Sequence, residues 1–232
     1  MRTLAVVPIK TLTAAKQRLS GALASGARQS LAQAMFSDVL AALRRSQRID
    51  EIAIVTADVV ANAVAHGPRT TVLPDDVQDG QSAATLIAIR FAAAADYERV
   101  VLVPGDTPLL DAVELDALLD RCEADGLDAG IVADRHGTGT NGLVLSPPDA
   151  LLPSFGPGSL ERHVAGAVMS GIVHRLEHVP SLEHDVDTPE DLAALADALT
   201  SVRTVAPRTL GALRQLDRSG ALHSLGRDPV NV

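Results

Sequence analysis

The chain has 232 residues, of which 47% are hydrophobic but only 2% aromatic, and its formal net charge is −9. This length suffices for one large α/β domain whose core has to be built from Ala, Val, Leu and Ile. Nucleic-acid-binding proteins neutralise phosphates with basic residues and stack bases on aromatic rings, so this composition argues against a nucleic-acid partner.

The sequence also argues against a membrane or secreted protein. Cys122 is the single cysteine, which excludes an intrachain disulfide and fits a reducing compartment. No apolar run approaches the length of a membrane span, and the N-terminus lacks a signal-peptide pattern. We therefore expect a cytoplasmic protein with no membrane partner.

The first predicted strand, at 4–9, is followed by a cluster of cations. Lys10, Lys16 and Arg18 lie within nine residues of one another. Cations directly after a strand are well placed to bind a triphosphate, and Arg18 could form two hydrogen bonds to one phosphate. A solvated basic loop is the alternative.

Helical and strand patterns alternate through the next segment. We expect helices at 27–43, 56–65 and 82–95, strands at 52–55 and 71–73, and an acidic loop at 74–80. Gly80, Gln81 and Ser82 lie at the start of the third helix, where backbone amides and a polar side chain could bind a nucleobase or ribose. Alternatively, Ser82 only caps the helix.

A strand predicted at 100–103 stops at Pro104 and Gly105, which places Asp106 at the carboxyl end of a central strand. In open α/β sheets, ligands bind at that edge. An Asp that only caps a turn is the alternative. A second acidic cluster, at Asp185 and Asp187, lies in a similar strand-to-helix context. Two carboxylates converging on one sheet edge indicate Mg²⁺, and magnesium indicates a nucleotide.

The C-terminal half continues the alternation. We expect helices at 111–125 and 160–170 and strands at 129–133, 143–145 and 173–179. The polar segment 134–142 is either a hairpin turn or, with Arg135, a site for an anionic substrate. Ser159 is predicted as the cap of a helix whose N-terminus suits an anion. Thr188 and Asp191 form a predicted capping box, which leaves Asp185 and Asp187 unexplained.

From Thr200 the pattern changes. Residues 200–232 are predicted as a C-terminal tail with one amphipathic helix at 209–219 and a frayed end at 226–232. Over residues 1–199 the alternation predicts one three-layer α/β domain with a mostly parallel sheet.

Five motifs occur in an order that resembles the phosphoenolpyruvate/2-phospho-L-lactate guanylyltransferases of coenzyme F420 biosynthesis, over roughly residues 3–197. The motifs are Val7-Pro8-Ile9-Lys10 with 15–20, Gly105-Asp106-Thr107-Pro108, 134–140, 155–159 and 185–189. The resemblance implies a GT-A-like nucleotidyltransferase domain at 1–199. It also implies transfer of GMP from GTP to the phosphate of a small three-carbon phospho-acid, with release of pyrophosphate.

The resemblance further implies roles for individual residues. It implies Mg²⁺ ligation by Asp106 and Asp187, acceptor binding by Thr140, Gly156 and Ser159, and triphosphate binding around Lys10, Lys16 and Arg18, with Lys16 also catalytic. Family members often carry Gly-Leu-Asn or Pro-Leu-Asn where this chain has Gly80-Gln81-Ser82. Gln81 or Ser82 would then have to recognise the guanine base.

The acceptor phosphate is already ionised at neutral pH, so the reaction needs no general base. An Ala- and Arg-rich composition is typical of GC-rich bacteria, for which the resemblance implies phosphoenolpyruvate rather than 2-phospho-L-lactate as acceptor. Two other hypotheses stay open: another sugar-phosphate nucleotidyltransferase or GT-A glycosyltransferase, and a non-catalytic nucleotide-binding protein. A homo-oligomer and hand-over of product to the next enzyme of the pathway also stay open.

Overall fold

Seven strands form one sheet in the computed structural model, which describes residues 1–12, 16–201 and 205–218. Their order across the sheet is β3-β2-β1-β4-β6-β5-β7. The strands are β1 (Thr3–Pro8), β2 (Glu51–Thr56), β3 (Thr70–Pro74), β4 (Arg99–Leu102), β5 (Ala129–Ala133), β6 (Thr140–Leu145) and β7 (His174–Glu177).

The sheet is mostly parallel, as predicted. β1 pairs in parallel with β2 and β4, β2 with β3, and β5 with β7. Only β6 runs against its neighbours β4 and β5. The polar segment 134–139 is therefore the connection of a β5–β6 hairpin, which confirms that reading of it. The carboxyl ends of β1 to β4 meet at one edge of the sheet.

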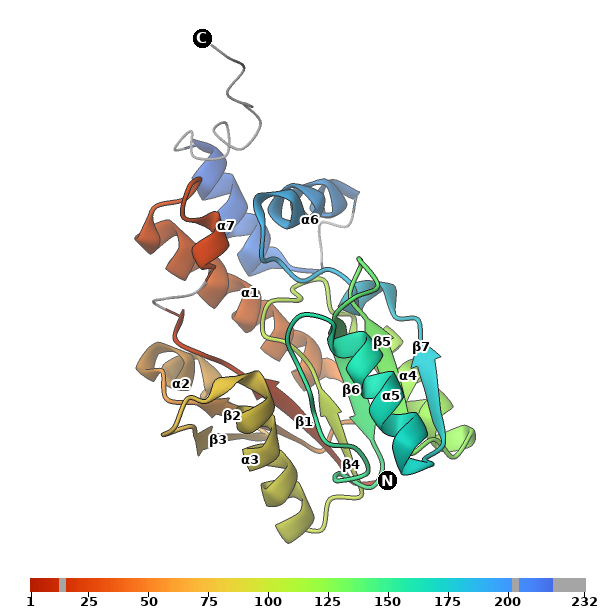
Figure 1. The fold of residues 1–232 in the computed structure, drawn as a ribbon. Coiled ribbons are helices and arrows are strands. Elements are labelled where there is room, and N and C mark those ends of the chain that lie inside the picture. The colour runs from red at the N-terminus through yellow and green to blue at the C-terminus, as the bar shows by residue number, and fades with distance from the viewer. Residues whose placement is uncertain (13–15, 202–204, 219–232) are drawn as a thin grey trace.

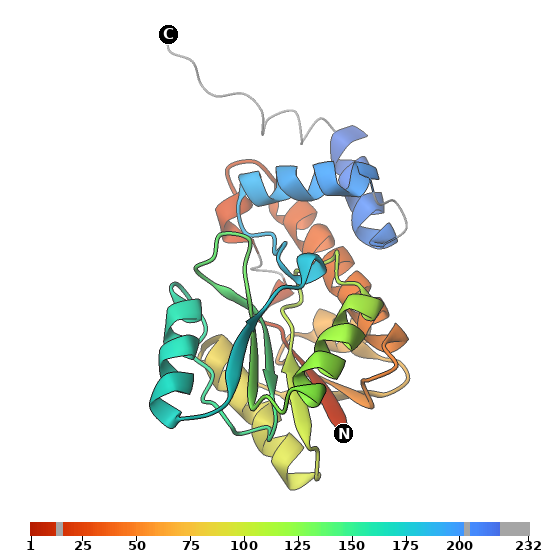
Figure 2. The same cartoon turned by 90° about the vertical axis from the view of Figure 1, so that its right-hand side faces the viewer.

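Helices cover both faces of the sheet (Figures 1 and 2). They are α1 (Ser25–Arg45), α2 (Val59–Ala65), α3 (Gly80–Ala94), α4 (Ala112–Ala124), α5 (Ser159–Ser170), α6 (Pro189–Ser201) and α7 (Pro207–Arg218), with short 3₁₀ turns η2 (Gln17–Leu19) and η3 (Pro180–Leu182). α3 and α5 pack on one face, whereas residues of α1, α2, α4, α6 and α7 join the core on the other. This arrangement confirms the three-layer prediction.

The alternation of side chains along β1 shows why two cores form. Ala5 and Val7 belong to the core under α1, whereas Leu4 and Val6 belong to the core under α3, and all four are fully buried. Successive side chains of a strand point to opposite faces, so a strand buried on both faces has to be apolar at every position. Val100 to Leu102 in β4 follow the same rule.

The predicted helix in the C-terminal tail is present as α7, and it packs against α1 and α6. Asp38 of α1 is buried and accepts hydrogen bonds from the amide nitrogen of Thr209, at 2.7 Å, and from its hydroxyl, at 2.8 Å. Leu213 and Leu216 are buried in the same core as α1. The prediction of a frayed end at 226–232 lies outside the described residues.

Three local predictions need correction. Thr140 belongs to β6, which begins three residues before the predicted strand. Gly158, in the left-handed region at φ 73°, caps α5, so Ser159 is its first helical residue rather than its cap. Asp79 precedes α3, so Ser82 lies in its first turn and does not cap it. In the described part of the chain, no helix combines the length and apolar character needed to cross a membrane.

Candidate functional site

A cavity of about 730 Å³ opens at the sheet edge where the carboxyl ends of β1, β3 and β4 meet. Its floor is formed by residues that directly follow β1 and β4, and one side by the segment from β3 to α3. Its lining includes Lys10, Lys16, Asp75, Gly80, Gln81, Asp106, Gly156 and Asp187. A cavity at this edge fits the general location of ligand sites in open α/β sheets.

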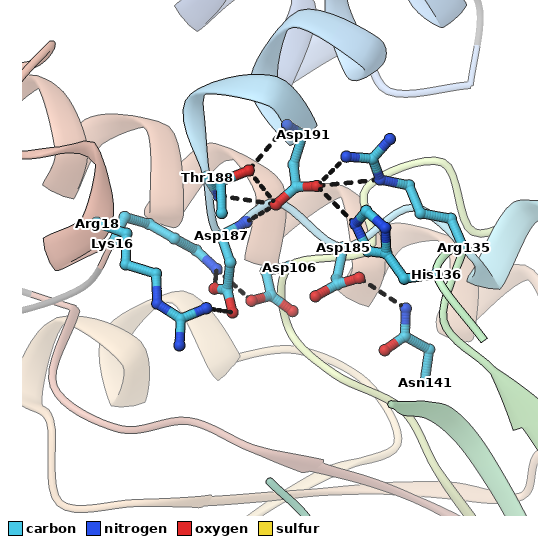
Figure 3. Close-up of polar contacts among 10 residues, drawn as sticks. All are labelled: Lys16, Arg18, Asp106, Arg135, His136, Asn141, Asp185, Asp187, Thr188 and Asp191. Atoms are coloured by element: carbon cyan, nitrogen blue, oxygen red, sulfur yellow. Dashed lines mark hydrogen bonds and ion pairs between the residues drawn. The ribbon is translucent and has the colours of Figure 1, made fainter. Parts of the chain in front are cut away.

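The buried ammonium of Lys16 joins the two carboxylates that the sequence singled out. Its Nζ contacts Oδ2 of Asp106 and lies 3.0 Å from Oδ1 of Asp187 (Figure 3). Burial works to lower the pKa of Lys16, but the charges and hydrogen bonds of Asp106 and Asp187 outweigh it and raise the pKa above its ordinary value. Lys16 is therefore a fixed positive charge between two carboxylates.

Lys16 holds this position with an unusual backbone. Its φ of 58° and ψ of 44° lie in the left-handed region, which non-glycine residues seldom adopt. Such conformations cost on the order of 1–3 kcal/mol and cluster at functional sites. This strained backbone conformation therefore indicates a functional role for Lys16, whose side chain points to the cavity.

Close packing under the end of β4 presents Asp106. A Cβ atom at Gly105 would lie only 2.2 Å from Cδ1 of Ile9, so a larger residue there would require the Ile9 side chain to move. Glycine thus lets the Ile9 side chain, next to Lys10, pack against the loop that carries Asp106. The Asp106 side chain remains partly exposed at the cavity wall.

Asp187 lies in the loop before α6 and not at the end of a strand, which corrects the predicted context. The predicted capping box holds this loop: Thr188 Oγ1 accepts a hydrogen bond from the Asp191 amide, and Asp191 Oδ2 accepts from the amides of Thr188, at 2.7 Å, and Asp187, at 3.0 Å. Arg135 Nε donates to the other Asp191 oxygen at 3.0 Å. These hydrogen bonds outweigh burial and lower the pKa of Asp191 to about 2.

A third carboxylate, that of Asp185, points toward Asp106 and Asp187 (Figure 3). Burial raises its pKa, with further contributions from the charges of Asp106 and Asp187. Asn141 Nδ2 donates a hydrogen bond to Asp185 Oδ1 at 2.9 Å and so opposes this rise. Asp185 thus adds negative charge beside the pair held by Lys16.

The loop after β1 is anchored by Asp58, the residue that caps α2. Asp58 Oδ1 accepts from the amides of Val60 and Ala61, and Oδ2 accepts from the Leu12 amide at 2.9 Å. Lys10 therefore lines the cavity on a supported loop. Arg18 is 70% exposed, and its guanidinium lies 3.8 Å from Asp187 Oδ2.

The loop that carries Gly156 is held from two sides. Ser82 Oγ, in α3, accepts a hydrogen bond from the Phe155 amide at 2.9 Å. Arg162, in α5, donates to Oγ and the carbonyl of Ser154 and to the carbonyls of Phe155 and Pro157. Gly156 itself adopts φ 105°, a conformation open to glycine. The loop therefore presents Gly156 to the cavity in a defined position.

Thr140 and Ser159 contact each other next to this loop. The Thr140 amide donates to Ser159 Oγ at 2.9 Å, and Thr140 Oγ1 lies 2.9 Å from Nδ1 of the buried His163. His163 Nε2 accepts from the Ser154 amide at 2.8 Å, which leaves the imidazole proton on Nδ1. Burial, with the nearby charge of Arg162, lowers the pKa of His163 to about 4.

We expect His163 to make the stability of the protein depend on pH. Because its pKa falls from 6.5 to about 4 on folding, the unfolded chain binds more protons between these values. The free energy of unfolding should therefore decrease by about 3 kcal/mol as the pH falls from 6.5 to 4. Urea titrations across this range measure it. His163→Gln should flatten the dependence, whereas His66→Gln, at an exposed site, should leave it unchanged.

The cavity includes some of the residues that the sequence singled out and not others. Lys10, Lys16, Gly80, Gln81, Asp106, Gly156 and Asp187 line it. Within the described ranges, five predicted residues lie outside that lining and contact residues that support it: Arg18, Ser82, Arg135, Thr140 and Ser159. Their direct contact with a ligand stays a prediction.

Four residues of the site were missed by the sequence reasoning. Asp58 carried a detectable signal, since an Asp before a helix is a common cap, but its bond to Leu12 is long-range. Asp75 was only one of several acids in a loop. Arg162 and His163 lie inside a helical pattern, and no local signal separates them from surface and core positions.

Comparisons with known proteins show which family the chain matches. Residues 3–198 match the family described as "Guanylyl transferase CofC like". A phosphoenolpyruvate guanylyltransferase of Conexibacter woesei is 45% identical over 219 residues, which cover 94% of this chain and 98% of that one. A protein of the same name from Sphaerobacter thermophilus is 36% identical, over 84% of this chain and 93% of its own.

Among solved structures, a Desulfovibrio desulfuricans G20 protein, provisionally assigned as a nucleotide-diphospho-sugar transferase, superimposes with a TM-score of 0.75. The match covers 98% of this chain and 100% of the other at 20% identity. This likeness confirms the predicted fold.

Proposed function

The chain belongs to the guanylyl transferase CofC-like family, and on this premise we propose that it transfers the guanylyl group of GTP to the phosphate of phosphoenolpyruvate. An oxygen of the phosphoenolpyruvate phosphate forms a bond to the α-phosphorus of GTP. The bond between the α-phosphorus and the bridging oxygen breaks, and pyrophosphate leaves. The observation that carries the proposal is the contact of Lys16 with both Asp106 and Asp187 at the wall of the cavity.

The donor set at this place fits Mg²⁺. Asp106 and Asp187 offer carboxylate oxygens beside the cavity, and Mg²⁺ is usually held by one or two carboxylates together with substrate phosphates and water. No group of three or more Asp, Glu, His or Cys side chains suited to a metal occurs in the described ranges. We therefore assign Asp106 and Asp187 as the residues that would hold the ion. When bound, the ion would neutralise charge on the phosphates.

Lys16 and Lys10 supply positive charge where the phosphates would lie. A buried ammonium in a site of low dielectric stabilises developing negative charge far more than an exposed one does. Lys16 is also held in place before substrate binds, so little reorganisation is needed. Alignment of two anions and neutralisation of their charge then account for the chemistry without a general base.

The acceptor would enter beside Gly156. The loop that carries this residue is fixed by Ser82, Arg162 and His163, so its backbone groups are preorganised toward the cavity. Thr140 and Ser159 support this wall from behind. We infer that they position the acceptor through the loop in addition to any direct contact.

Pyrophosphate release from GTP and Mg²⁺ tests the function. We expect turnover with phosphoenolpyruvate at a higher kcat/KM than with 2-phospho-L-lactate. Phosphoenolpyruvate has a planar carbon skeleton, whereas 2-phospho-L-lactate carries two more hydrogens and is tetrahedral at the carbon that bears the phosphate. A preference of about tenfold to a hundredfold is the range that such a small difference in shape supports.

The outcomes separate the parts of the proposal. A preference for 2-phospho-L-lactate would contradict the acceptor and leave the guanylyl transfer standing. No pyrophosphate with either acceptor would contradict the function as a whole.

A further inference from the structure

The carboxylate of Asp75 is buried in the wall of the cavity with one oxygen unused. Asp75 directly follows β3 and is only 4% exposed, yet it lines the cavity. Its Oδ1 accepts a hydrogen bond from the Gln78 amide at 3.0 Å. Across the residues that the structure describes, no protein donor bonds to Oδ2. Oδ2 is not among the buried side-chain atoms that lack a partner, so it is accessible at the cavity wall, where a bound ligand can donate a hydrogen bond to it.

The position of Asp75 matches the base end of a bound nucleotide. Asp106 follows β4, and the sheet order β3-β2-β1-β4 separates β3 from β4 by three strand spacings, which is about 14 Å. In Figure 1 the segment from β3 to α3 borders the same edge of the sheet as the ends of β1 and β4. A nucleotide with its phosphates at Lys16 and Asp106 therefore extends its base toward Asp75.

The cations and Asp75 are carried by different parts of the sheet edge. Lys10 follows β1 and Lys16 contacts Asp106, which follows β4, whereas Asp75 follows β3, two positions from β1 in the sheet order. The Asp75 carboxylate itself repels phosphate. Beside Asp75, a Cβ atom built at Gly80 would meet nothing within 4 Å, so the start of α3 leaves open space at the cavity wall. The Asp75 end therefore favours an uncharged group with hydrogen-bond donors.

Among the bases, guanine fits a carboxylate acceptor best. Its N1–H and 2-amino groups are adjacent donors, which one carboxylate can accept together. Adenine and cytosine present an acceptor beside a donor on the corresponding edge, so one carboxylate oxygen would face a lone pair. Uracil has one donor between two carbonyls.

We propose that Asp75 is the residue that selects guanine, by accepting hydrogen bonds from N1–H and the 2-amino group of GTP. This inference deepens the proposed function and rests on it for the identity of the nucleotide. It moves base selection away from Ser82, whose Oγ accepts a hydrogen bond from the Phe155 amide, and leaves Gln81 as a neighbouring residue of the cavity lining. The backbone of Gln78 positions the carboxylate through its bond to Oδ1.

Analogues of GTP test the inference in the unmodified protein. Inosine triphosphate lacks only the 2-amino group, and xanthosine triphosphate replaces it with a carbonyl. With Mg²⁺ and no acceptor, calorimetric titration should give Kd values about tenfold weaker for inosine triphosphate and at least about a hundredfold weaker for xanthosine triphosphate than for GTP.

Asp75→Asn converts one acceptor into a donor, which complements the carbonyl of xanthine. The variant should bind GTP at least about thirtyfold more weakly and xanthosine triphosphate at least about tenfold more tightly than the unmodified protein. A gain in affinity cannot result from misfolding. Asp76→Asn, at the exposed neighbouring position, is the matched control and should keep the preference of the unmodified protein for GTP.

Equal affinity of the unmodified protein for the three nucleotides would overturn the inference, as would an Asp75→Asn variant that still prefers GTP to xanthosine triphosphate. The proposed function fails by a different result, namely selective GTP binding without pyrophosphate release on addition of phosphoenolpyruvate. Selective binding together with the switch in Asp75→Asn supports the assignment of Asp75 in either case.

Discussion

Exchange of Asp106 for Asn is expected to lower kcat/KM for pyrophosphate release at least about a hundredfold, a loss of about 2.7 kcal/mol in transition-state stabilisation. The exchange removes a negative charge that contacts Lys16 and that, in the proposed function, would hold Mg²⁺. Asn keeps the size of the side chain, so the fold should persist. Steady-state kinetics at saturating Mg²⁺ and a thermal melt measure the two effects separately.

Asp187→Asn should show a loss of similar size, because its carboxylate contacts the same ammonium. Asp149→Asn is the matched control, at an exposed position outside the cavity lining, and should retain full activity. If Asp106→Asn turned over at nearly the normal rate, the assignment of the metal-holding residues would be wrong, whatever the acceptor.

Exchange of Lys16 for Met is the second change with a large expected effect. Loss of a buried, preorganised positive charge should lower kcat at least about a hundredfold, in line with the removal of single charge-stabilising groups in other enzymes. Removal of the ammonium also frees Asp106 and Asp187 from a competing cation. The variant should therefore bind Mg²⁺ more tightly in the absence of nucleotide, which calorimetry can measure.

Lys10→Met is the comparison that the chain itself offers, since Lys10 and Lys16 are its two lysines. Lys10 is exposed at the cavity, whereas the Lys16 side chain is buried between its two carboxylates. Exposed charges are screened by solvent, so Lys10→Met should cost less than about tenfold. Equal losses in the two variants would contradict a special role for Lys16.

The expected effects of the Asp106 and Lys16 exchanges depend on contacts that local sequence patterns indicate only in part. The aliphatic run at 100–103 followed by Pro104 and Gly105 was enough to place Asp106 at the end of a buried strand. Thr188 and Asp191 were enough to predict the start of α6. In each case neighbouring residues set the backbone dihedrals, so a short window of sequence carries the information.

The pairing of β6 with β4 could not be predicted in the same way. The hairpin interpretation of 134–142 makes β6 antiparallel to β5, but an aliphatic strand buried on both faces carries no local sign of its second neighbour. Likewise, the helix α7 was predictable from its amphipathic pattern, but its attachment to Asp38 joins residues 171 positions apart. Strand order and helix docking depend on how the whole core packs.

The sequence by itself thus determined the α/β class, most of the elements and the positions of the acidic residues along the chain. Tertiary structure alone decided that Lys16 lies between Asp106 and Asp187, that Asp75 is buried in the cavity wall, and that Arg135 pairs with Asp191. The physical reason is that dihedral angles and the facing of side chains are local properties. The meeting of buried charges depends instead on the order of strands across the sheet, which the packing of the entire chain sets.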